Sequence, residues 1–306
     1  MRAAGVRQFG AVIEPLDLPA PRRPLADEVL VAVQAAGVGN WDEFVRTGSW
    51  DTGIQPPLAL GVEAAGVVTA VGDGVKDIGV GTLVATHSMP LREQGSWAES
   101  FLVPAADVAP VPPGVSAAAA AAAAVPALTA DQAIVDGLHL QAGQTVLVHG
   151  AGGVTGGMLV QHAVSCGARV IATAGPDSAD RVRAMGATTV VDYHQPGWPE
   201  RIRAQTGGVD AAVNAARDGA ADAAATVRDG GRLATITGDP PQPGRGIVVT
   251  AVQVVPNGPR LCHLLKLVAT GMLTIEVAAR SPLEEAAAAL DRTRHGMHGA
   301  VIVLCP

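Results

Sequence analysis

Small residues around position 151 form a pattern that could hold a dinucleotide. Residues 149–157 read His-Gly-Ala-Gly-Gly-Val-Thr-Gly-Gly, which matches the spacing A-x-G-x-x-G from Ala151 to Gly156. Glycines let the backbone come close to a pyrophosphate, and the positive end of a following helix stabilises its negative charge. Read alone, the motif also fits a connecting turn without a ligand. In its predicted strand-turn-helix context we expect this turn to bind the pyrophosphate of a dinucleotide.

The choice between NADPH and NADH depends on the segment after the next predicted strand, residues 169–174. An NAD site usually has an acid at this point, where it accepts hydrogen bonds from the ribose hydroxyls. Here the strand runs into Gly175, and Asp177 comes only after a proline. Ser178 and Arg181 follow, and a hydroxyl and a guanidinium could hold a 2′-phosphate. This segment favours NADPH, and a solvated helix face is the alternative role for Arg181.

The 306 residues fall into two regions that differ in their predicted secondary structure. Residues 1–112 contain short apolar runs between Gly and Pro, such as 28–34 and 64–71, which are typical of strands. After a helix of eight alanines, strands alternate with helices, which indicates a doubly wound parallel sheet. Its strands are expected at residues 145–149, 169–174, 188–192, 209–213 and 231–237.

The last part of the chain is predicted to return to the first domain. We expect a strand at 274–278, a helix at 283–292 and a strand at 300–304. The prediction is therefore an α/β protein with two domains. Residues 1–112 and 272–306 form a mostly β domain, and residues 113–271 form the dinucleotide-binding domain.

The amino-acid composition argues against some classes of binding partner. The formal charge is −7 and no dense Lys/Arg cluster is present, which argues against nucleic acid or an anionic membrane. No stretch reaches the roughly 18 strongly apolar residues that span a bilayer, and the first 20 residues do not resemble a signal peptide. The three cysteines, Cys166, Cys262 and Cys305, lack the spacing of zinc ligands. We expect a cytoplasmic protein that binds a small molecule.

The chain resembles the medium-chain dehydrogenase/reductase superfamily, and more narrowly its zinc-independent quinone oxidoreductase and enoyl reductase branch. Besides the glycine turn, residues 35–48 and 60–72 are similar to the family's GroES-like catalytic domain. The resemblance implies a GroES-like domain and a Rossmann domain. Zinc-dependent relatives have an early catalytic Cys and a Gly-His-Glu sequence where this chain has Gly61-Val62-Glu63. The resemblance therefore implies no catalytic or structural zinc.

The resemblance also implies a set of cofactor contacts. Thr129 should approach the nicotinamide, and Gly175, Ser178, Arg181 and Tyr193 should surround the adenosine phosphate. Contacts to the pyrophosphate are expected from Gly152, Gly153, Val154 and Thr155. Packing on the sheet edge is the alternative role for Tyr193. Contacts beside the nicotinamide ribose are expected from Asn214 and Gly238.

Candidates for the substrate site come from the first domain. Developing charge on a substrate oxygen needs a donor, and Asn40 is the first candidate, although the family's asparagine corresponds to Gly39. Trp41 and Trp97 are expected as apolar walls with N–H groups. His87, after the predicted strand at 82–86, could deliver a proton. A structural His87, with solvent as the proton source, is the alternative.

The predicted function is a zinc-independent, NADPH-dependent reductase that transfers hydride to a quinone or an α,β-unsaturated carbonyl. One alternative is a specialised enoyl reductase or cyclising enzyme of secondary-metabolite biosynthesis. Another is an NADPH-binding regulatory module with little catalytic activity. Residues 246–255 predict a long apolar edge strand, which favours a homodimer unless the strand is covered within the chain.

Overall fold

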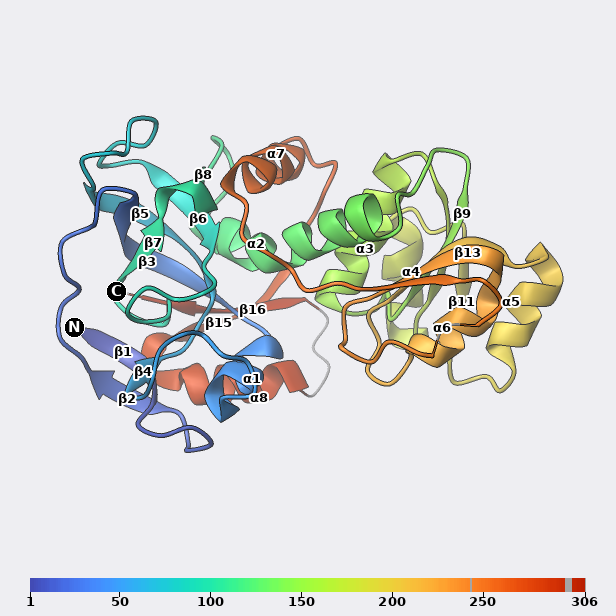
Figure 1. Cartoon of the computed structure of the whole chain (residues 1–306), viewed down its shortest axis with the longest axis horizontal. Coiled ribbons are helices and arrows are strands. Elements are labelled where there is room, and N and C mark those ends of the chain that lie inside the picture. Colours follow the sequence, from blue (N-terminus) through green and yellow to red (C-terminus); the bar gives the residue numbers. More distant parts are fainter. Residues whose placement is uncertain (243, 295–298, 306) are drawn as a thin grey trace. The chain divides into compact units, whose positions relative to one another are not determined.

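The computed structural model describes residues 1–242, 244–294 and 299–305. The chain forms two compact units, Met1–Val125 with Val255–Pro306, and Pro126–Val254, called here the first and second unit (Figure 1). The domain bounds 1–112 with 272–306, and 113–271, stay a prediction from the sequence. The N–H of Val125 donates to Glu63 of the first unit, at 2.6 Å. In the same unit, helix α7 (Gly258–Ala269) packs on strand β8 (Val108–Pro110).

The first unit is built from two mostly antiparallel sheets. The small sheet has the order β2-β1-β4, and the large one β15-β16-β3-β5-β6-β8, with β7 also paired to β3. β15 and β16 run parallel. The remaining strands are β1 (Arg2–Val6), β2 (Glu14–Asp17), β3 (Glu28–Val38), β4 (Leu58–Ala59), β5 (Glu63–Val71), β6 (Leu83–His87), β7 (Ser100–Pro104), β15 (Val277–Pro282) and β16 (Ala300–Leu304).

Strand register brings three chain segments to one edge of the large sheet. Ala36 of β3 pairs with Ala64 of β5, and Glu63 of β5 pairs with His87 of β6. Because adjacent strands are antiparallel, the end of β3, the start of β5 and the end of β6 lie at the same edge. Residues 39–42, 60–63 and 87–88 are called the first-unit edge. Helix α1 (Trp41–Thr47) begins within it.

The second unit has a parallel sheet in the order β11-β10-β9-β12-β13-β14. This order is that of a Rossmann dinucleotide-binding sheet, so the predicted fold is confirmed. Val146, Leu147 and Val148 of β9 are all fully buried, because both faces of a parallel sheet are covered. The strands are β9 (Thr145–His149), β10 (Arg169–Thr173), β11 (Thr189–Val191), β12 (Val209–Asn214), β13 (Val227–Thr235) and β14 (Val248–Ala251).

Four helices that position the candidate site connect these strands (Figure 1). Helix α3 packs against β9 and β10, whereas the aromatic and aliphatic residues Trp198 and Ile202 of α5 join the core formed by Leu147 and Leu233. The helices are α3 (Val154–Ser165), α4 (Pro176–Ala184), α5 (Trp198–Thr206) and α6 (Ala220–Thr226).

Three predicted strands were clearly wrong in extent. The strand expected at 231–237 is β13, which begins four residues earlier and ends at Thr235. The strand expected at 274–278 is β15, Val277–Pro282, because its pairing with β16 begins only where Val277 meets Ala300. The long edge strand expected at 246–255 is only β14, Val248–Ala251, at the edge of the sheet. It begins after a turn in which Gly246 has a positive φ of 68°, and it pairs with β13 only from Arg232 to Thr235.

The alanine-rich helix is longer and more apolar than expected. α2 (Ala117–Asp131) continues into a π-helix, Gln132–Gly137. By length and composition, residues 117–137 could cross a membrane, because the most apolar 18 residues of this helix have a mean hydropathy of 1.4. The prediction that no stretch qualifies was therefore wrong. Of these 18 residues, 83% are buried inside the protein. Core helices of soluble proteins are buried in the same way. This is weak evidence for a membrane span, and the cytoplasmic location stays a prediction.

Candidate functional site

The glycine turn at residues 150–156 joins β9 to α3 in the second unit. Gly150 has a φ of 85°, and Gly153 precedes the first residue of α3. A Cβ at Gly156 would lie 2.1 Å from the carbonyl oxygen of Gly150, so the helix touches the turn and leaves no room for a side chain. Gly153 is exposed, and Gly152, Val154 and Thr155 are half-buried. This turn is a backbone cradle of the kind that fits a pyrophosphate.

Ser178 and Arg181 of α4 lie against the glycine turn. The guanidinium of Arg181 donates to the carbonyl oxygen of Gly152 at 2.5 Å. A Cβ at Gly152 would approach Ser178 Oγ to 2.7 Å, and this hydroxyl donates to the carbonyl of Gly175 at 3.3 Å. The structure therefore brings together residues that the sequence analysis assigned to one phosphate site.

Aromatic rings line the same end of the sheet. Tyr193 is exposed, and its ring centroid lies 4.1 Å from that of His194 and 6.5 Å from that of His149. His149 ends β9, stacks at 4.9 Å on Trp198, and its Nδ1 lies 2.6 Å from Thr173 Oγ1. Burial lowers the pKa of His149 despite the nearby carboxylates of Asp222 and Asp239. Tyr193 follows β11, and a Cβ at Gly175 would lie 3.9 Å from its ring. Its place near the adenosine phosphate and its alternative role, packing on the sheet edge, both stay predictions.

Asn214 is the last residue of β12. Its side chain is fully buried, and its amide donates to the carbonyl of Ala216 at 3.0 Å and to Thr237 Oγ1 at 2.8 Å. Its Oδ1 accepts from the N–H of Ala216 at 3.1 Å. The Asn214 side chain therefore connects the segments that follow β12 and β13. Because its polar atoms are used in these bonds, a contact to a ribose at this position would come from the backbone. Gly238 is exposed with a φ of 76°.

Asp239 was missed by the sequence analysis. Its carboxylate accepts hydrogen bonds from Thr235 Oγ1 at 3.0 Å, from Thr237 Oγ1 and from the N–H of Ala220 at 3.3 Å. Burial alone would raise the pKa of Asp239, but the hydrogen bonds from these three groups hold it below its usual value. The second unit therefore has a negative charge at the carboxyl end of β13.

Thr129 lies on the part of α2 that belongs to the second unit. Its side chain is largely buried, with 7% exposed.

Asn40 and Trp41 stand at the first-unit edge. Asn40 is exposed, and its Oδ1 accepts a hydrogen bond from Thr293 at 3.2 Å. The indole of Trp41 fills the space beside Gly39, because a Cβ at Gly39 would lie 2.2 Å from ring atom Cε2. Within the described residues, the buried Nε1 of Trp41 has no hydrogen-bond partner. The edge thus has an exposed amide side chain at Asn40 and a buried indole N–H at Trp41.

His87 and Trp97 are placed differently from expectation. His87 is the last residue of β6, fully buried, with its Nδ1 3.0 Å from the carbonyl oxygen of Val62. Trp97 is also fully buried, and its Nε1 donates to the carbonyl of Gly37 at 3.0 Å. The Trp97 N–H is therefore used within the fold. The structure gives His87 no open path to a ligand.

Two buried carboxyl groups occupy the same edge. Asp42 accepts a hydrogen bond from the N–H of Gly39 at 2.8 Å, and burial raises the pKa of Asp42 to about 8. Glu63 accepts from the N–H of Val125, and burial, together with the nearby Asp42, raises the pKa of Glu63 well above its usual value. Glu63 corresponds to the acid of the zinc relatives' motif, but no sequence pattern indicated that Asp42 would be buried beside it.

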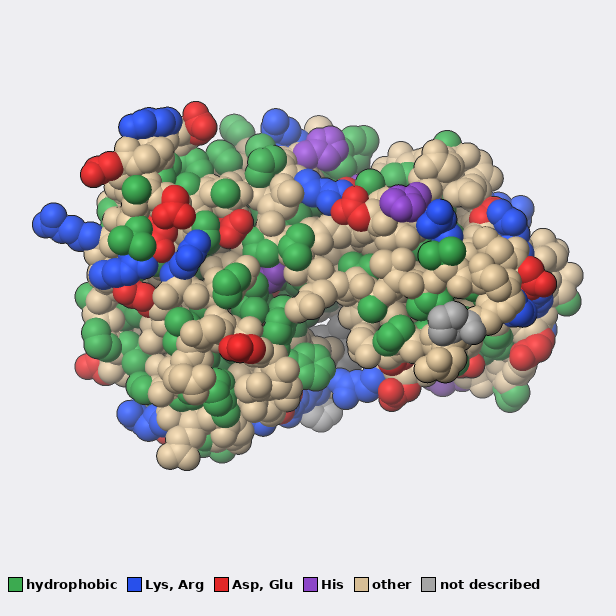
Figure 2. All heavy atoms as spheres, in the orientation of Figure 1, with side chains coloured by type: hydrophobic (Ala, Val, Ile, Leu, Met, Phe, Trp, Pro, Cys, Tyr) green, Lys and Arg blue, Asp and Glu red, His purple; other side chains and the backbone are tan. Residues whose placement is uncertain are grey.

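In residues 1–242, 244–294 and 299–305, no group of three or more His, Cys, Asp or Glu side chains could hold a metal ion. On the face in Figure 2, acidic and basic side chains are interspersed rather than gathered by sign.

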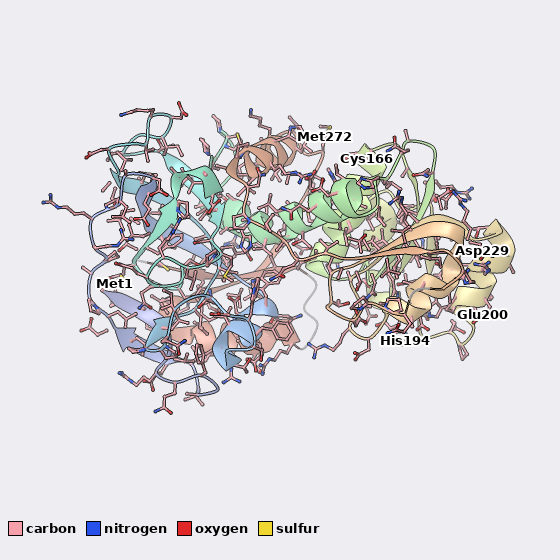
Figure 3. All side chains as sticks on the ribbon, in the orientation of Figure 1. Met1, Cys166, His194, Glu200, Asp229 and Met272 are labelled. Carbon is pink, nitrogen blue, oxygen red and sulfur yellow. The ribbon has the colours of Figure 1, made fainter. Side chains whose placement is uncertain are left out.

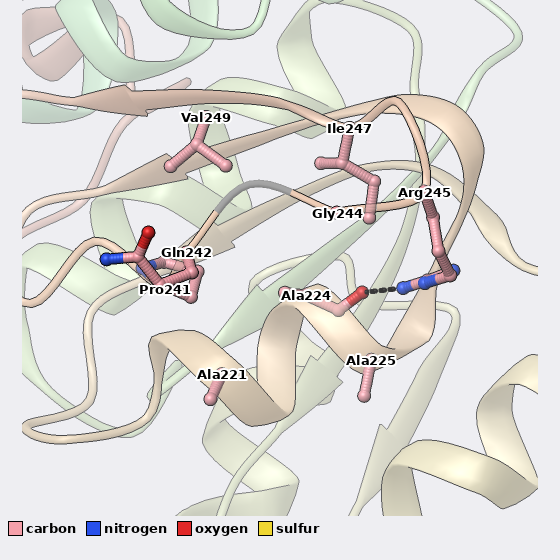
Figure 4. Close-up of a pocket in the computed structure, with 9 residues that line it drawn as sticks. All are labelled: Ala221, Ala224, Ala225, Pro241, Gln242, Gly244, Arg245, Ile247 and Val249. Carbon is pink, nitrogen blue, oxygen red and sulfur yellow. Dashed lines mark hydrogen bonds between the residues drawn. The ribbon is translucent and has the colours of Figure 1, made fainter.

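A hollow of about 280 Å³ lies in the second unit between α6 and β14 (Figure 4). Arg245 lies at this hollow and donates to the carbonyl of Ala224 at 2.6 Å. None of the predicted site residues lines it, so it is not part of the candidate site.

Comparisons with known proteins agree with this arrangement. Residues 25–113 match the family described as the alcohol dehydrogenase GroES-like domain, and residues 154–264 match the family described as zinc-binding dehydrogenase. A quinone oxidoreductase of Lama guanicoe is 31% identical over 218 residues, which are 70% of this chain and 65% of that protein. The chain therefore matches slightly less than two thirds of that relative's length.

Solved structures match the whole chain. A structure titled NAD-dependent alcohol dehydrogenase is 31% identical, with a TM-score of 0.89, and covers 100% of both chains. The mycobacterial protein Rv1454c, solved in complex with NADPH, is 29% identical with a TM-score of 0.88 and covers 99% of this chain and 100% of that one. The second unit is thus a nicotinamide-dinucleotide-binding domain. By its two matched domains, its fold and these relatives, the chain belongs to the medium-chain dehydrogenase/reductase superfamily.

Proposed function

We propose that this chain is a zinc-independent, NADPH-dependent reductase of quinones or α,β-unsaturated carbonyls. The observation that carries the proposal is the contact of Ser178 and Arg181 with the glycine turn, at Gly152. β10 ends there without an acid that would accept bonds from ribose hydroxyls. A hydroxyl and a guanidinium at this position suit a phosphate. The relative solved with NADPH supports this choice, whereas the relative titled NAD-dependent keeps NADH as its competitor.

The chain's own residues would bind and orient the reactants. A bound nicotinamide supplies the hydride. The glycine turn would hold the pyrophosphate, and Arg181 and Ser178 the 2′-phosphate. The electron-poor carbon of an enone or a quinone accepts hydride and leaves negative charge on the substrate oxygen. Hydrogen-bond donors at that oxygen lower the barrier.

Asn40 and Trp41 are the proposed donors to the substrate oxygen. The Trp41 N–H is buried without a partner among the described residues, which is costly unless a ligand or water uses it. Trp97 serves as a buried support, because its N–H is bonded to Gly37. Solvent is the proposed proton source, since His87 is enclosed. Zinc independence is proposed because Val62 stands where the zinc-dependent motif has His.

The test is turnover and metal content of the purified chain. Oxidation of NADPH and of NADH is followed at 340 nm with a panel of quinones and enones, before and after dialysis against a chelator. The proposal predicts turnover of at least one compound class, a higher kcat/KM with NADPH, and no loss on chelation. Tight NADPH binding without turnover of any compound would instead favour a regulatory module. Loss of activity on chelation, restored by zinc, would contradict zinc independence.

We also propose a homodimer formed through β14. This short strand lies at the edge of the sheet, and its first residue, Val248, is 49% exposed. An exposed apolar edge favours pairing with a second copy. Sedimentation velocity of the wild type and of Val248→Lys tests this. The expected result is a dimer that the variant converts to monomer, and a monomeric wild type would refute the proposal.

A further inference from the structure

A carboxylate that the proposed function does not use lies at the carboxyl end of the parallel sheet. Asp239 follows β13, and its Oδ1 accepts hydrogen bonds from Thr235 Oγ1 at 3.0 Å, from Thr237 Oγ1 and from the amide of Asn214 at 3.4 Å. Its Oδ2 accepts the N–H of Ala220, the first residue of α6, at 3.3 Å. Groups from β12, β13 and α6 therefore hold this side chain in one orientation.

The Asp239 side chain carries a negative charge at neutral pH. Burial raises the pKa of this half-buried carboxyl, but the hydrogen bonds that it accepts lower the pKa further, so the pKa lies below its usual value. Among the described residues, no Lys, Arg or His forms an ion pair with this carboxylate. The second unit thus has a fixed charge here that no cation of its own compensates.

This charge acts close to the glycine turn. Asn214, which bonds to Asp239, pairs with His149 across β12 and β9, and His149 directly precedes the turn. Burial lowers the pKa of His149, and the carboxylates of Asp222 and Asp239 act on that pKa in the opposite direction. Gly238, next to Asp239, is exposed, and nothing lies within 4 Å of a Cβ there. A ligand on the turn can therefore come near Asp239.

The strand order indicates which part of a dinucleotide would lie near this carboxylate. The order β11-β10-β9-β12-β13-β14 consists of two halves that meet between β9 and β12, and each half binds one mononucleotide. The adenosine half is the one that contains β10, because the end of that strand meets the adenosine ribose. The nicotinamide half is therefore the one that contains β12 and β13. Asp239 follows β13, so it borders the nicotinamide half.

The two redox forms of a nicotinamide differ in charge. The reduced ring is neutral, and it becomes a cation when it gives a hydride, which is one proton with two electrons, to the electron-poor carbon of the substrate. A fixed carboxylate attracts the cation, and the attraction is stronger in a partly buried site than in bulk water. The neutral ring gains no such attraction.

We propose that Asp239 makes the second unit favour the oxidised nicotinamide over the reduced one, and that it thereby makes the bound reduced cofactor a stronger hydride donor. The inference rests on nicotinamide binding by the second unit, and it applies to NADPH and NADH alike. It assigns Asp239 an electrostatic role in addition to its structural bonds to the strand ends.

Affinities of both redox forms test the inference without turnover. Calorimetry on the full chain gives the Kd of NADP⁺ and of NADPH, and their ratio removes effects that both forms share, such as repulsion of the phosphates. Asp239→Asn keeps an acceptor for Thr235 and Thr237 and removes the charge. The preference for NADP⁺ over NADPH should fall by about fivefold or more, the size of the attraction between unit charges about 4 Å apart in bulk water. NAD⁺ and NADH should show the same fall.

Two further sets of variants separate charge from shape and position. Asp239→Glu and Asp239→Gln have the same shape and differ in charge, so the first should keep the wild-type preference better than the second, even if Asp239→Asn fails to fold. Asp229 (Figure 3) lies near the amino end of β13 and pairs with Arg203 at 3.0 Å and Arg245 at 3.1 Å. Asp229→Asn is the matched control and should leave the preference unchanged.

The outcomes distinguish this inference from the reductase proposal. An unchanged preference in Asp239→Asn, or an equal loss of affinity for both redox forms, overturns the inference and leaves the reductase proposal standing. A larger change in Asp222→Asn than in Asp239→Asn also overturns it, because the charge on α6 would then be responsible. A fall in Asp239→Asn without one in Asp229→Asn supports it. Absence of turnover with every quinone and enone would remove the reductase proposal alone.

Discussion

The two sheet edges that carry the candidate residues differ in the burial of their polar groups. At the first-unit edge, Asp42, Glu63 and His87 are at most 2% exposed, and Asp42 and Glu63 accept backbone N–H groups. At the carboxyl edge of the second unit, Gly153, Tyr193 and His194 are exposed. The first edge therefore uses buried polar groups to fix its loops, whereas the second keeps donors at the surface, where a phosphate can reach them.

This difference separates two kinds of mutational effect. Changes at the first-unit edge should alter the free energy of unfolding or the chemical step, because few of its polar groups can meet a ligand directly. Changes at the second-unit edge should alter cofactor affinity, because its donors are accessible.

The largest expected effect is on the pH dependence of stability through Asp42. The pKa of this carboxyl is about 8 in the folded protein, against about 3.9 in an unfolded chain. Between these values the folded state keeps a proton that the unfolded state has lost. The free energy of unfolding should therefore be highest at low pH and fall by up to about 1.4 kcal/mol per pH unit until about pH 8.

Urea denaturation at pH 5, 6, 7 and 8 measures this slope. Asp42→Asn keeps an acceptor for the N–H of Gly39 but cannot ionise, so its slope should be shallower than that of the wild type. Glu63 contributes with the same sign in both proteins. Asp77→Asn, at an exposed acid, is the control. Equal slopes in Asp42→Asn and the wild type would show that Asp42 is ionised in the fold.

The next effect concerns the Trp41 donor. Trp41→Phe keeps an aromatic ring beside Gly39 and removes the N–H. Loss of one donor to a developing oxyanion typically costs about 100-fold or more in kcat, so kcat for an enone should fall by about that factor. NADPH affinity measured by calorimetry should stay unchanged. Unaltered kcat would assign the donor role to Asn40 alone.

A methyl group at Gly156 should damage the second-unit edge. In Gly156→Ala the Cβ would lie 2.1 Å from the carbonyl oxygen of Gly150, so α3 and the turn must separate. Overpacking of this kind costs about 1–3 kcal/mol of stability, and NADPH affinity should fall as well. Gly79→Ala is the control, because nothing lies within 4 Å of a Cβ there. Thermal unfolding and calorimetry on both variants give the comparison.

The smallest effect is expected for Arg181→Gln. Removing the guanidinium should weaken NADPH binding by about tenfold, the size of one hydrogen bond to a charged group, and leave NADH binding unchanged. Arg183→Gln on the same helix is the matched control, because its ion pair with Asp180 lies on an exposed surface. Equal weakening of NADPH and NADH would mean that Arg181 supports the turn through its bond to Gly152 instead of binding the 2′-phosphate.

Sequence patterns predicted the parts of the fold that depend on local residues. The bounds of β9 and β16 match their predicted ranges, because each is a short apolar run between turn residues. The predicted strand at 246–255 is longer than β14, because β14 extends only as far as it pairs with β13. This pairing joins residues far apart in the sequence, so a local pattern does not reveal it. The burial of Asp42 beside Glu63 depends on the register of β3, β5 and β6. The bonds of Asp239 to Asn214 and Ala220 likewise need β12 and β13 to be neighbours, which no spacing along the chain reveals.

The packing of Trp41 on Gly39 restricts how this edge can evolve. Since a Cβ at position 39 would overlap the indole, a side chain at 39 and this orientation of Trp41 exclude each other. One arrangement has a side chain at position 39, and the other has glycine there with an indole at position 41. A lineage that gains the indole must first lose the side chain at 39, or pass through a destabilised intermediate. The identities of positions 39 and 41 should therefore covary among relatives, and this pair can mark the subgroup to which a new sequence belongs.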